Sequence, residues 1–272
     1  MAFAEVNGAR LWYELEGDGP AVALIHEAIG DSGLWDDLFP ELARRYRTLR
    51  YDARGFGRST LPQEPYSHHE DLRTLLDTLG LEQVALVGGS MGGRVALELA
   101  VTEPERVTAL VVLAPGVEPW EPSEEVRRFG EAEDEAVEQG DLDAAVELNL
   151  DLWVAGPGRA LADIDRDVVS RVREMQRRAF EIQVPAFQRD PAPRRKPLPG
   201  GPVGERLGEI RAPTLVIVGS EDVEDMHRVA DRVVERVPGA RKTVVEDAAH
   251  AANVERPQEF NRLVLEFLAS IL

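Results

Sequence analysis

Short, nearly continuous apolar runs alternate along this chain with longer segments in which apolar residues recur every three or four positions. Six runs are bounded by turn residues: AVALIH (21–26), YRTLRYD (46–52), QVALVGG (83–89), VTALVVLAP (107–115), PTLVIVG (213–219) and KTVVED (242–247). Several consist almost entirely of Val, Leu and Ile, which is typical of strands buried on both faces of a parallel sheet.

The segments between these runs predict helices over 34–46, 69–80, 92–103, 225–237 and 258–272. Alternation of strands and helices indicates a doubly wound α/β fold with helices on both faces of the sheet. The first twenty residues predict an antiparallel edge hairpin that turns at Asn7-Gly8. Together the pattern predicts a mostly parallel sheet of eight strands.

The alternation stops between residues 118 and 205, where the chain is highly charged, helical in pattern and closed by the proline-rich stretch DPAPRRKPLPGGPVG. We interpret 118–205 as a helical cap (lid) inserted into a core domain formed by 1–117 and 206–272. The alternative is a pair of additional surface helices.

The 272 residues carry a net charge of −19 and no cysteine. The acidic balance argues against nucleic acid and anionic membrane surfaces as partners, and the missing thiols exclude disulfides and thiolate metal sites. No apolar run reaches the roughly 20 residues of a membrane span, and the N-terminal segment has no apolar signal core. We therefore expect a cytoplasmic location.

Gly88-x-Ser90-x-Gly92 lies where an apolar strand turns into a helix. A serine on such a strained turn is lifted above the sheet as an exposed nucleophile, while the next amide, that of Met91, points at a developing oxyanion. Small residues at 88 and 92 avoid collisions across the turn. A phosphate-binding loop would need Gly-Lys-Ser/Thr after the glycines, which is absent here.

A serine nucleophile needs a base, and the base needs an acid to orient it. Of the five histidines, His250 follows the last predicted strand and fits the chain order Ser, Asp, His. Asp222 follows the preceding strand, although Glu221, Glu224 and Asp225 lie beside it. Loops at the carboxyl ends of parallel strands converge, so these side chains can meet.

Five segments in this order resemble the α/β-hydrolase family over nearly the whole chain: VNGARLWYELEGDGPAVALIH (6–26), YDARGFGRS (51–59), GGSMGG (88–93), VGSED (218–222) and AAHAANVERPQEF (248–260). The chain looks most like bacterial carboxylesterases, enol-lactonases such as 3-oxoadipate enol-lactonase, and cofactor-free C–C hydrolases. This resemblance implies the fold predicted above, with 118–205 as the cap, and Asp52-x-Arg54-Gly55 as a structural turn.

The resemblance also places the second oxyanion donor in the loop after strand 21–26. Many relatives read His-Gly there, and the following amide donates; here the chain reads His26-Glu27-Ala28, so the donor is Ala28. Glu27 is a departure, because a carboxylate near an oxyanion opposes catalysis. Two interpretations stay open: Glu27 turns outward and is bonded within the loop, or it reaches the pocket and shapes substrate choice.

The residues and the resemblance together indicate a serine hydrolase that cleaves a small carboxylic ester or lactone through an acyl-enzyme. Alternatives on the same site are C–C hydrolysis and perhydrolysis, and a different class is a non-catalytic ligand receptor. Glu27, Trp35 and Trp153 are candidate substrate-binding residues, and Met91 is a candidate wall of the pocket. No metal or organic cofactor is implied, and a homodimer is one option for assembly.

Overall fold

Eight strands form one sheet in the computed structural model, which describes residues 1–272. They are β1 (Ala2–Val6), β2 (Ala9–Glu16), β3 (Ala21–Ile25), β4 (Arg47–Tyr51), β5 (Val84–Gly89), β6 (Val107–Leu113), β7 (Thr214–Gly219) and β8 (Arg241–Val245), in the spatial order β1-β2-β4-β3-β5-β6-β7-β8. Only β2 runs antiparallel to its two neighbours, and all other pairs are parallel. The predicted mostly parallel eight-stranded sheet is confirmed.

The N-terminal hairpin turns where the sequence predicted it. Asn7 and Gly8 both have positive φ, 46° and 79°. This is the backbone that a two-residue hairpin turn requires and that Asn-Gly adopts at little cost. The hairpin adds an edge to the sheet and pairs with β4 through Tyr13 and Tyr51.

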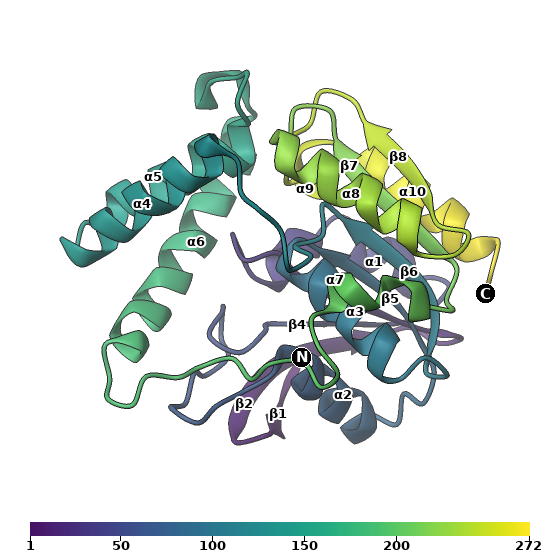
Figure 1. Cartoon of the computed structure of the whole chain (residues 1–272). Coiled ribbons are helices and arrows are strands. Elements are labelled where there is room, and N and C mark those ends of the chain that lie inside the picture. The colour runs from purple at the N-terminus through teal and green to yellow at the C-terminus, as the bar shows by residue number, and fades with distance from the viewer.

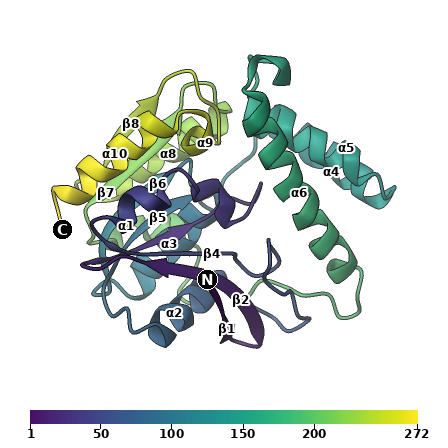
Figure 2. The same cartoon turned by 180° about the vertical axis from the view of Figure 1, so that it is seen from behind.

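Helices cover both faces of the sheet. α3 (Met91–Thr102) and α8 (Glu224–Arg236) lie on one face, and α1 (Phe39–Ala43) and α10 (Pro257–Ala269) lie on the other (Figures 1 and 2). α2 (His68–Thr78) precedes β5, and the short helix α9 (Ala252–Glu255) precedes α10. No helix is both long enough and apolar enough to cross a membrane.

The helix predicted over 34–46 is split in two. A 3-10 turn, η1 (Ser32–Trp35), comes first, and α1 begins only at Phe39. Pro40 causes the break, because a proline in a helix interior removes one hydrogen bond and clashes with the preceding turn. In the first turn of α1 its missing N–H costs nothing.

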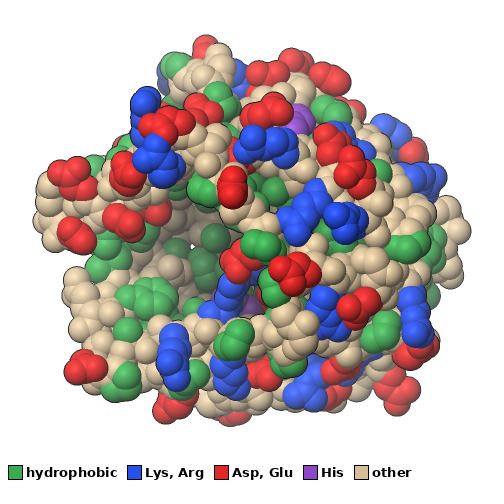
Figure 3. All heavy atoms as spheres, in the orientation of Figure 1, with side chains coloured by type: hydrophobic (Ala, Val, Ile, Leu, Met, Phe, Trp, Pro, Cys, Tyr) green, Lys and Arg blue, Asp and Glu red, His purple; other side chains and the backbone are tan.

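The segment between β6 and β7 holds α4 (Glu124–Glu138), α5 (Leu142–Asn149), a π-helical turn η2 (Leu150–Ala155), η3 (Leu161–Asp163), the long helix α6 (Arg166–Phe187), α7 (Val203–Arg206) and η4 (Leu207–Glu209). α4, α5 and α6 stand apart from the sheet on one side of the molecule (Figure 1). A hollow in the surface separates them from the body of the protein (Figure 3).

The apolar interior has two parts. The larger one surrounds the sheet, and the smaller one packs the inner faces of α4, α5 and α6 together. The smaller cluster also contains Ile29 and Leu34, which follow β3, and Ala251 and Val254, which follow β8. The inserted helices are therefore packed against two of the loops in which the sequence placed candidate site residues.

Candidate active site

Ser90 occupies the turn between β5 and α3 with a backbone that side-chain-bearing residues rarely adopt. Its φ is 48° and its ψ is −111°. Three backbone hydrogen bonds hold it: its amide donates to Leu113 O at 2.8 Å, and its carbonyl accepts from Gly116 N and Arg94 N at 3.0 Å each. Strain of this kind persists only where the surroundings enforce it, and it concentrates at functional sites.

The two glycines around Ser90 let neighbouring backbone pass very close. A Cβ at Gly88 would lie 2.5 Å from the carbonyl carbon of Gly92 and 2.8 Å from Gly93 N. A Cβ at Gly92 would lie 2.5 Å from the carbonyl carbon of Ile25 and 2.7 Å from His26 O. The start of α3 thus presses against the end of β3, which brings the Ser90 turn to the loop that begins at His26.

The two predicted oxyanion donors, Met91 and Ala28, lie on these adjoining segments. Met91 is the first residue of α3, where amides have no partner within the helix. Ala28 lies in the loop after β3, and its amide makes no hydrogen bond within the protein. Backbone amides arranged in this way are the usual donors to a tetrahedral oxyanion.

His26 and Gln176 fix the loop that carries Ala28. His26 Nε2 accepts from Ala53 N at 2.9 Å, so Nδ1 carries the proton and donates to Glu27 O at 2.8 Å. Burial lowers the pKa of His26 and keeps it neutral. The buried amide of Gln176, on α6, faces the carbonyl oxygens of Ala28 and Ile29 at 3.1 and 3.0 Å, and its nitrogen donates to both.

His250 and Asp222 meet at the carboxyl edge of the sheet. His250 Nδ1 lies 3.0 Å from Asp222 Oδ2, and both side chains are buried. Asp222 Oδ1 accepts from Val223 N at 2.8 Å, which fixes the carboxylate. The neighbouring Asp225 instead accepts from Ser123 N at 3.0 Å, at the start of α4. Geometry therefore singles out Asp222 among the four acidic residues between positions 221 and 225.

Burial and two carboxyl groups set the proton affinity of the His250 imidazole. Burial lowers its pKa, but the charge and hydrogen bond of Asp222 and the charge of Glu27 outweigh burial and raise the pKa above its ordinary value. No hydrogen bond joins Ser90 Oγ to His250 in this structure. Such bonds often form only when substrate is bound.

The inserted segment contacts the His250 loop directly. The ring of Trp153, on η2, lies 4.7 Å from the imidazole of His250, centroid to centroid. Arg159 pairs with Glu255 at 2.9 Å, and Glu255 accepts from Ala249 N at 2.8 Å. A chain of contacts therefore runs from the insertion to the residue just before His250. π-helical turns such as η2 are frequent at functional sites.

Glu27 points inward, so the interpretation that it turns outward is wrong. Its side chain is fully buried and lies against Gly89, where a Cβ would be 2.5 Å from Cδ and 2.7 Å from Cγ. Neither carboxyl oxygen has a hydrogen-bond partner with good geometry. Burial raises the pKa of Glu27 to about 7, which the backbone amide of Glu27 itself, the positive field of His250 and the side chain of Asn253 partly oppose.

Other predicted residues lie apart from this constellation. Trp35 has no exposed surface and packs against Phe260 in the main core, so it is not available to a substrate in this structure. Asp52 accepts from Ser32 N and Arg58 N at 3.1 and 2.8 Å, as expected of a structural turn.

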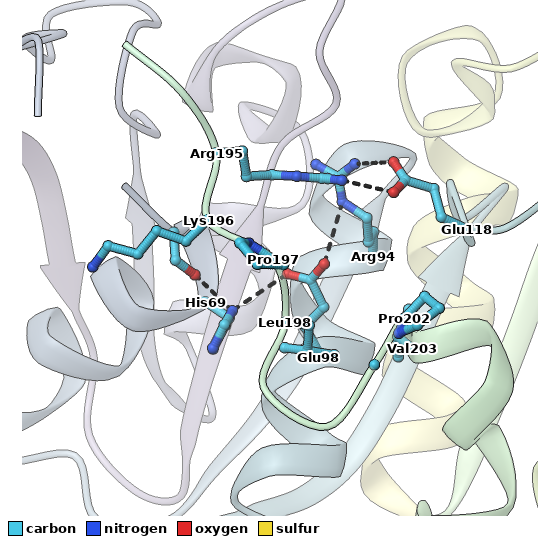
Figure 4. Close-up of a pocket in the computed structure, with 12 residues that line it drawn as sticks. His69, Arg94, Glu98, Glu118, Arg195, Lys196, Pro197, Leu198, Pro202 and Val203 are labelled. Atoms are coloured by element: carbon cyan, nitrogen blue, oxygen red, sulfur yellow. Dashed lines mark hydrogen bonds and ion pairs between the residues drawn. The ribbon is translucent and has the colours of Figure 1, made fainter. Parts of the chain in front are cut away.

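A separate polar pocket of about 360 Å³ lies beside α3, one helical turn beyond Ser90 (Figure 4). Arg94 and Arg195 both bind the carboxylate of Glu118, at 3.1 and 2.7 Å, and Arg94 also faces Glu98 at 3.6 Å. Burial and the charge of Arg195 lower the pKa of Arg94. The network ties the returning chain after α6 to α3.

Neither Gln176 nor Arg159 was predicted. Both lie in the charged, irregular insertion, where no motif marks them, and both act on loops more than 80 residues away in the sequence. No three or more His, Cys, Asp and Glu side chains group in a way that could hold a metal ion.

The α/β arrangement of this chain has counterparts among known proteins. A model of the alpha/beta hydrolase fold family matches residues 20–257. This chain belongs to the α/β-hydrolase family. It is 28% identical to the 2-hydroxy-6-oxo-6-phenylhexa-2,4-dienoate hydrolase of Comamonas testosteroni, over 94% of this chain and 90% of that protein.

Solved structures of hydrolases share the fold of this family member. A hydrolase from Pseudomonas aeruginosa PA01 superposes with a TM-score of 0.80 at 30% identity, covering 98% of this chain and 97% of the other. Est816, an N-acyl homoserine lactone degrading enzyme, superposes with a TM-score of 0.76 at 25% identity, covering 98% and 100%.

Proposed function

We propose that this α/β-hydrolase is a serine hydrolase that cleaves a small carboxylic ester or lactone through an acyl-enzyme. The observations that support the proposal are the strained Ser90 turn, φ 48°, and the buried Asp222–His250 pair at 3.0 Å. The likeness to a lactone-degrading enzyme over the whole chain supports lactones as one substrate class.

In the proposed mechanism Ser90 Oγ attacks the carbonyl carbon and His250 takes its proton. Asp222 holds the imidazole tautomer and stabilises the imidazolium. The oxyanion accepts hydrogen bonds from the amides of Ala28 and Met91, and a donor of this kind is typically worth ~3 kcal/mol. His250 then returns the proton to the leaving alcohol, and water activated by the same imidazole releases the acid.

Residues 118–205 act in this proposal as a cap whose helices bound the hollow in Figure 3. Trp153 lies against His250 and is half-buried, so it is the aromatic residue best placed to contact a bound acyl or alcohol group. Apolar walls with a few fixed polar groups are typical of such pockets.

The test is covalent labelling followed by a substrate screen. A fluorophosphonate probe should attach to the wild type and not to Ser90→Ala, and the wild type should hydrolyse members of a panel of short esters, lactones and enol-lactones. Activity that survives in Ser90→Ala would contradict the mechanism. A protein that is labelled but cleaves only vinylogous diketones would instead be a C–C hydrolase, the reaction class suggested by the Comamonas relative.

A further inference from the structure

Arg94 and Arg195 are two cations that no step of the mechanism above uses, and they meet in the polar pocket beside α3. Arg94 Nη1 donates to Glu118 Oε1 at 3.1 Å, and Arg195 Nη2 donates to Glu118 Oε2 at 2.7 Å. Figure 4 shows both guanidinium groups directed at this one carboxylate. Because two cations that share a partner repel each other, the pair requires an anion between them.

Each guanidinium group has hydrogen-bonding capacity left over. The bond to Glu118 is the only side-chain hydrogen bond that either arginine makes within the protein, although a guanidinium carries several more N–H donors. Arg94 Nε is buried, has no hydrogen-bond partner and lies 3.6 Å from Glu98 Oε1. A different acceptor can therefore bind to the same two arginines.

The backbone fixes the arginines, whereas the carboxylate between them lies nearer the surface. The segment that carries Arg195 pairs with Tyr66, whose amide and carbonyl bond to the residues before and after that arginine at 3.0 and 2.7 Å. Arg94 stands on α3, and its side chain is 16% exposed, against 47% for Glu118. The Glu118 side chain can therefore rotate into solvent while the two guanidinium groups stay in place.

The remaining walls of the pocket fit the hydrocarbon part of a small organic acid. The volume of about 360 Å³ lies within the range of small-molecule sites. Lys196 adds a third basic side chain, and Glu98 is the one acid that stays in the lining when Glu118 turns away. Apolar surface comes from four residues of the segment after α6: Pro197, Leu198, Pro202 and Val203.

We propose that this pocket binds a small organic carboxylate, whose acid group takes the place of the Glu118 side chain between Arg94 and Arg195. A carboxylate matches the pair because each of its two oxygens meets one guanidinium group, as the oxygens of Glu118 do. Exchange of one carboxylate for another keeps the charge balance of the pocket. Glu118 is therefore an internal competitor of the ligand.

The same acid group belongs to a free organic acid and to the far end of an acidic substrate. Ser90, Asp222 and His250 do not line the pocket, which favours a free acid as the ligand. Binding of a free acid uses none of the catalytic steps proposed above, so it can be tested separately from them.

Calorimetric titration with glutarate tests the site in the full chain and in three variants. Glu118→Gln keeps the size of the competitor and removes its charge, so glutarate should bind about tenfold more tightly than to the wild type. Arg195→Gln removes one guanidinium group, so binding should weaken by about tenfold or more. Glu105→Gln is the matched control: it removes the same charge from an exposed pair with Arg211, and the affinity should stay that of the wild type.

A folded Glu118→Gln protein that binds glutarate no more tightly than the wild type would overturn the inference. Inorganic phosphate that binds as tightly as glutarate would overturn the choice of a carboxylate. If the variants do not fold, nitrogen NMR of the arginine-labelled wild type still provides the test. Glutarate should shift two guanidinium signals and its neutral diamide should not, and equal shifts with both compounds would contradict the site.

Ester hydrolysis distinguishes a free acid from an acidic substrate. With a free acid as the ligand, Arg195→Gln should leave KM unchanged for both nitrophenyl butyrate and the nitrophenyl half-ester of glutaric acid. A KM that rises in Arg195→Gln for the half-ester alone would support the same pocket and assign the carboxylate to the substrate. A wild type that hydrolyses no ester would contradict the proposed function, while the titration would still report on the pocket.

Discussion

Replacing Gly92 with alanine tests the closest approach in the site. In the structure the new Cβ would lie 2.5 Å from the carbonyl carbon of Ile25 and 2.7 Å from His26 O. Both neighbours belong to the backbone at the end of β3, which cannot rotate away as a flexible side chain can. Overpacking of this kind costs about 3 kcal/mol, and the gain of alanine over glycine in a helix returns about 1 kcal/mol.

Gly92→Ala should therefore lower the free energy of unfolding by about 2 kcal/mol, or the Tm by about 5 °C for a chain of this size. Because relief of the clash moves the Ala28 loop away from Ser90, kcat should fall by about a hundredfold. Thermal unfolding by circular dichroism and ester hydrolysis would measure the two effects.

Gly130→Ala is the matched control for this change. Gly130 lies inside α4, and a Cβ there would meet nothing within 4 Å. The same substitution should raise the Tm by about 2 °C, since only the helix preference acts. A Gly92→Ala protein as stable and active as the wild type would refute the close approach between α3 and β3.

Three further outcomes are expected. Asp222→Asn should lower kcat by roughly four orders of magnitude while leaving the fold intact, since the buried His250 loses the carboxylate that orients it. An unchanged rate of Ser90 labelling by a fluorophosphonate would argue against a role for the Asp222–His250 pair. The pKa of Glu27 is about 7 against an ordinary 4.5, so the folded protein holds the proton more tightly than the unfolded chain. This group therefore stabilises the fold by about 3 kcal/mol below pH 4.5 and loses that contribution as the pH rises through 7. Urea unfolding should show this fall of the unfolding free energy with pH in the wild type relative to Glu27→Gln. Gln176→Ala should lower kcat/KM more than Gln183→Ala. Gln176 holds the carbonyls of Ala28 and Ile29, whereas Gln183 donates to Gly55 O at 3.1 Å. Equal effects of the two substitutions would contradict a specific role of Gln176 in holding the loop.

The sheet and the Ser90 turn were predictable because local rules govern them. Strands buried on both faces leave uninterrupted apolar runs, and a sharp turn with backbone packed against it needs glycines at 88 and 92. The same local reasoning failed at 34–46, where the apolar spacing suggested one helix. The amphipathic pattern was real, but a proline in a helix interior costs a hydrogen bond and a clash, and Pro40 lies instead in the first turn of α1.

The support around the site was not predictable from sequence because it depends on contacts between distant segments. Gln176 reaches the Ala28 loop across 148 positions of the chain, and nothing near Gln176 in the sequence marks it. The inward direction of Glu27 depends on the missing side chain of Gly89, 62 positions later. Such pairs are recognisable only when the two backbones are placed together.

The smaller apolar cluster has a consequence for how variants of this protein can arise. It joins the inner faces of α4, α5 and α6 to Ile29 and Leu34 on one loop and to Ala251 and Val254 on another. An exchanged or repacked insertion would therefore alter the placement of Ala28 and His250 along with the shape of the hollow. Grafting residues 118–205 from another member of the family should succeed only when these four residues are exchanged with it. Selection for a new substrate would then also act on the geometry of the proposed catalytic residues.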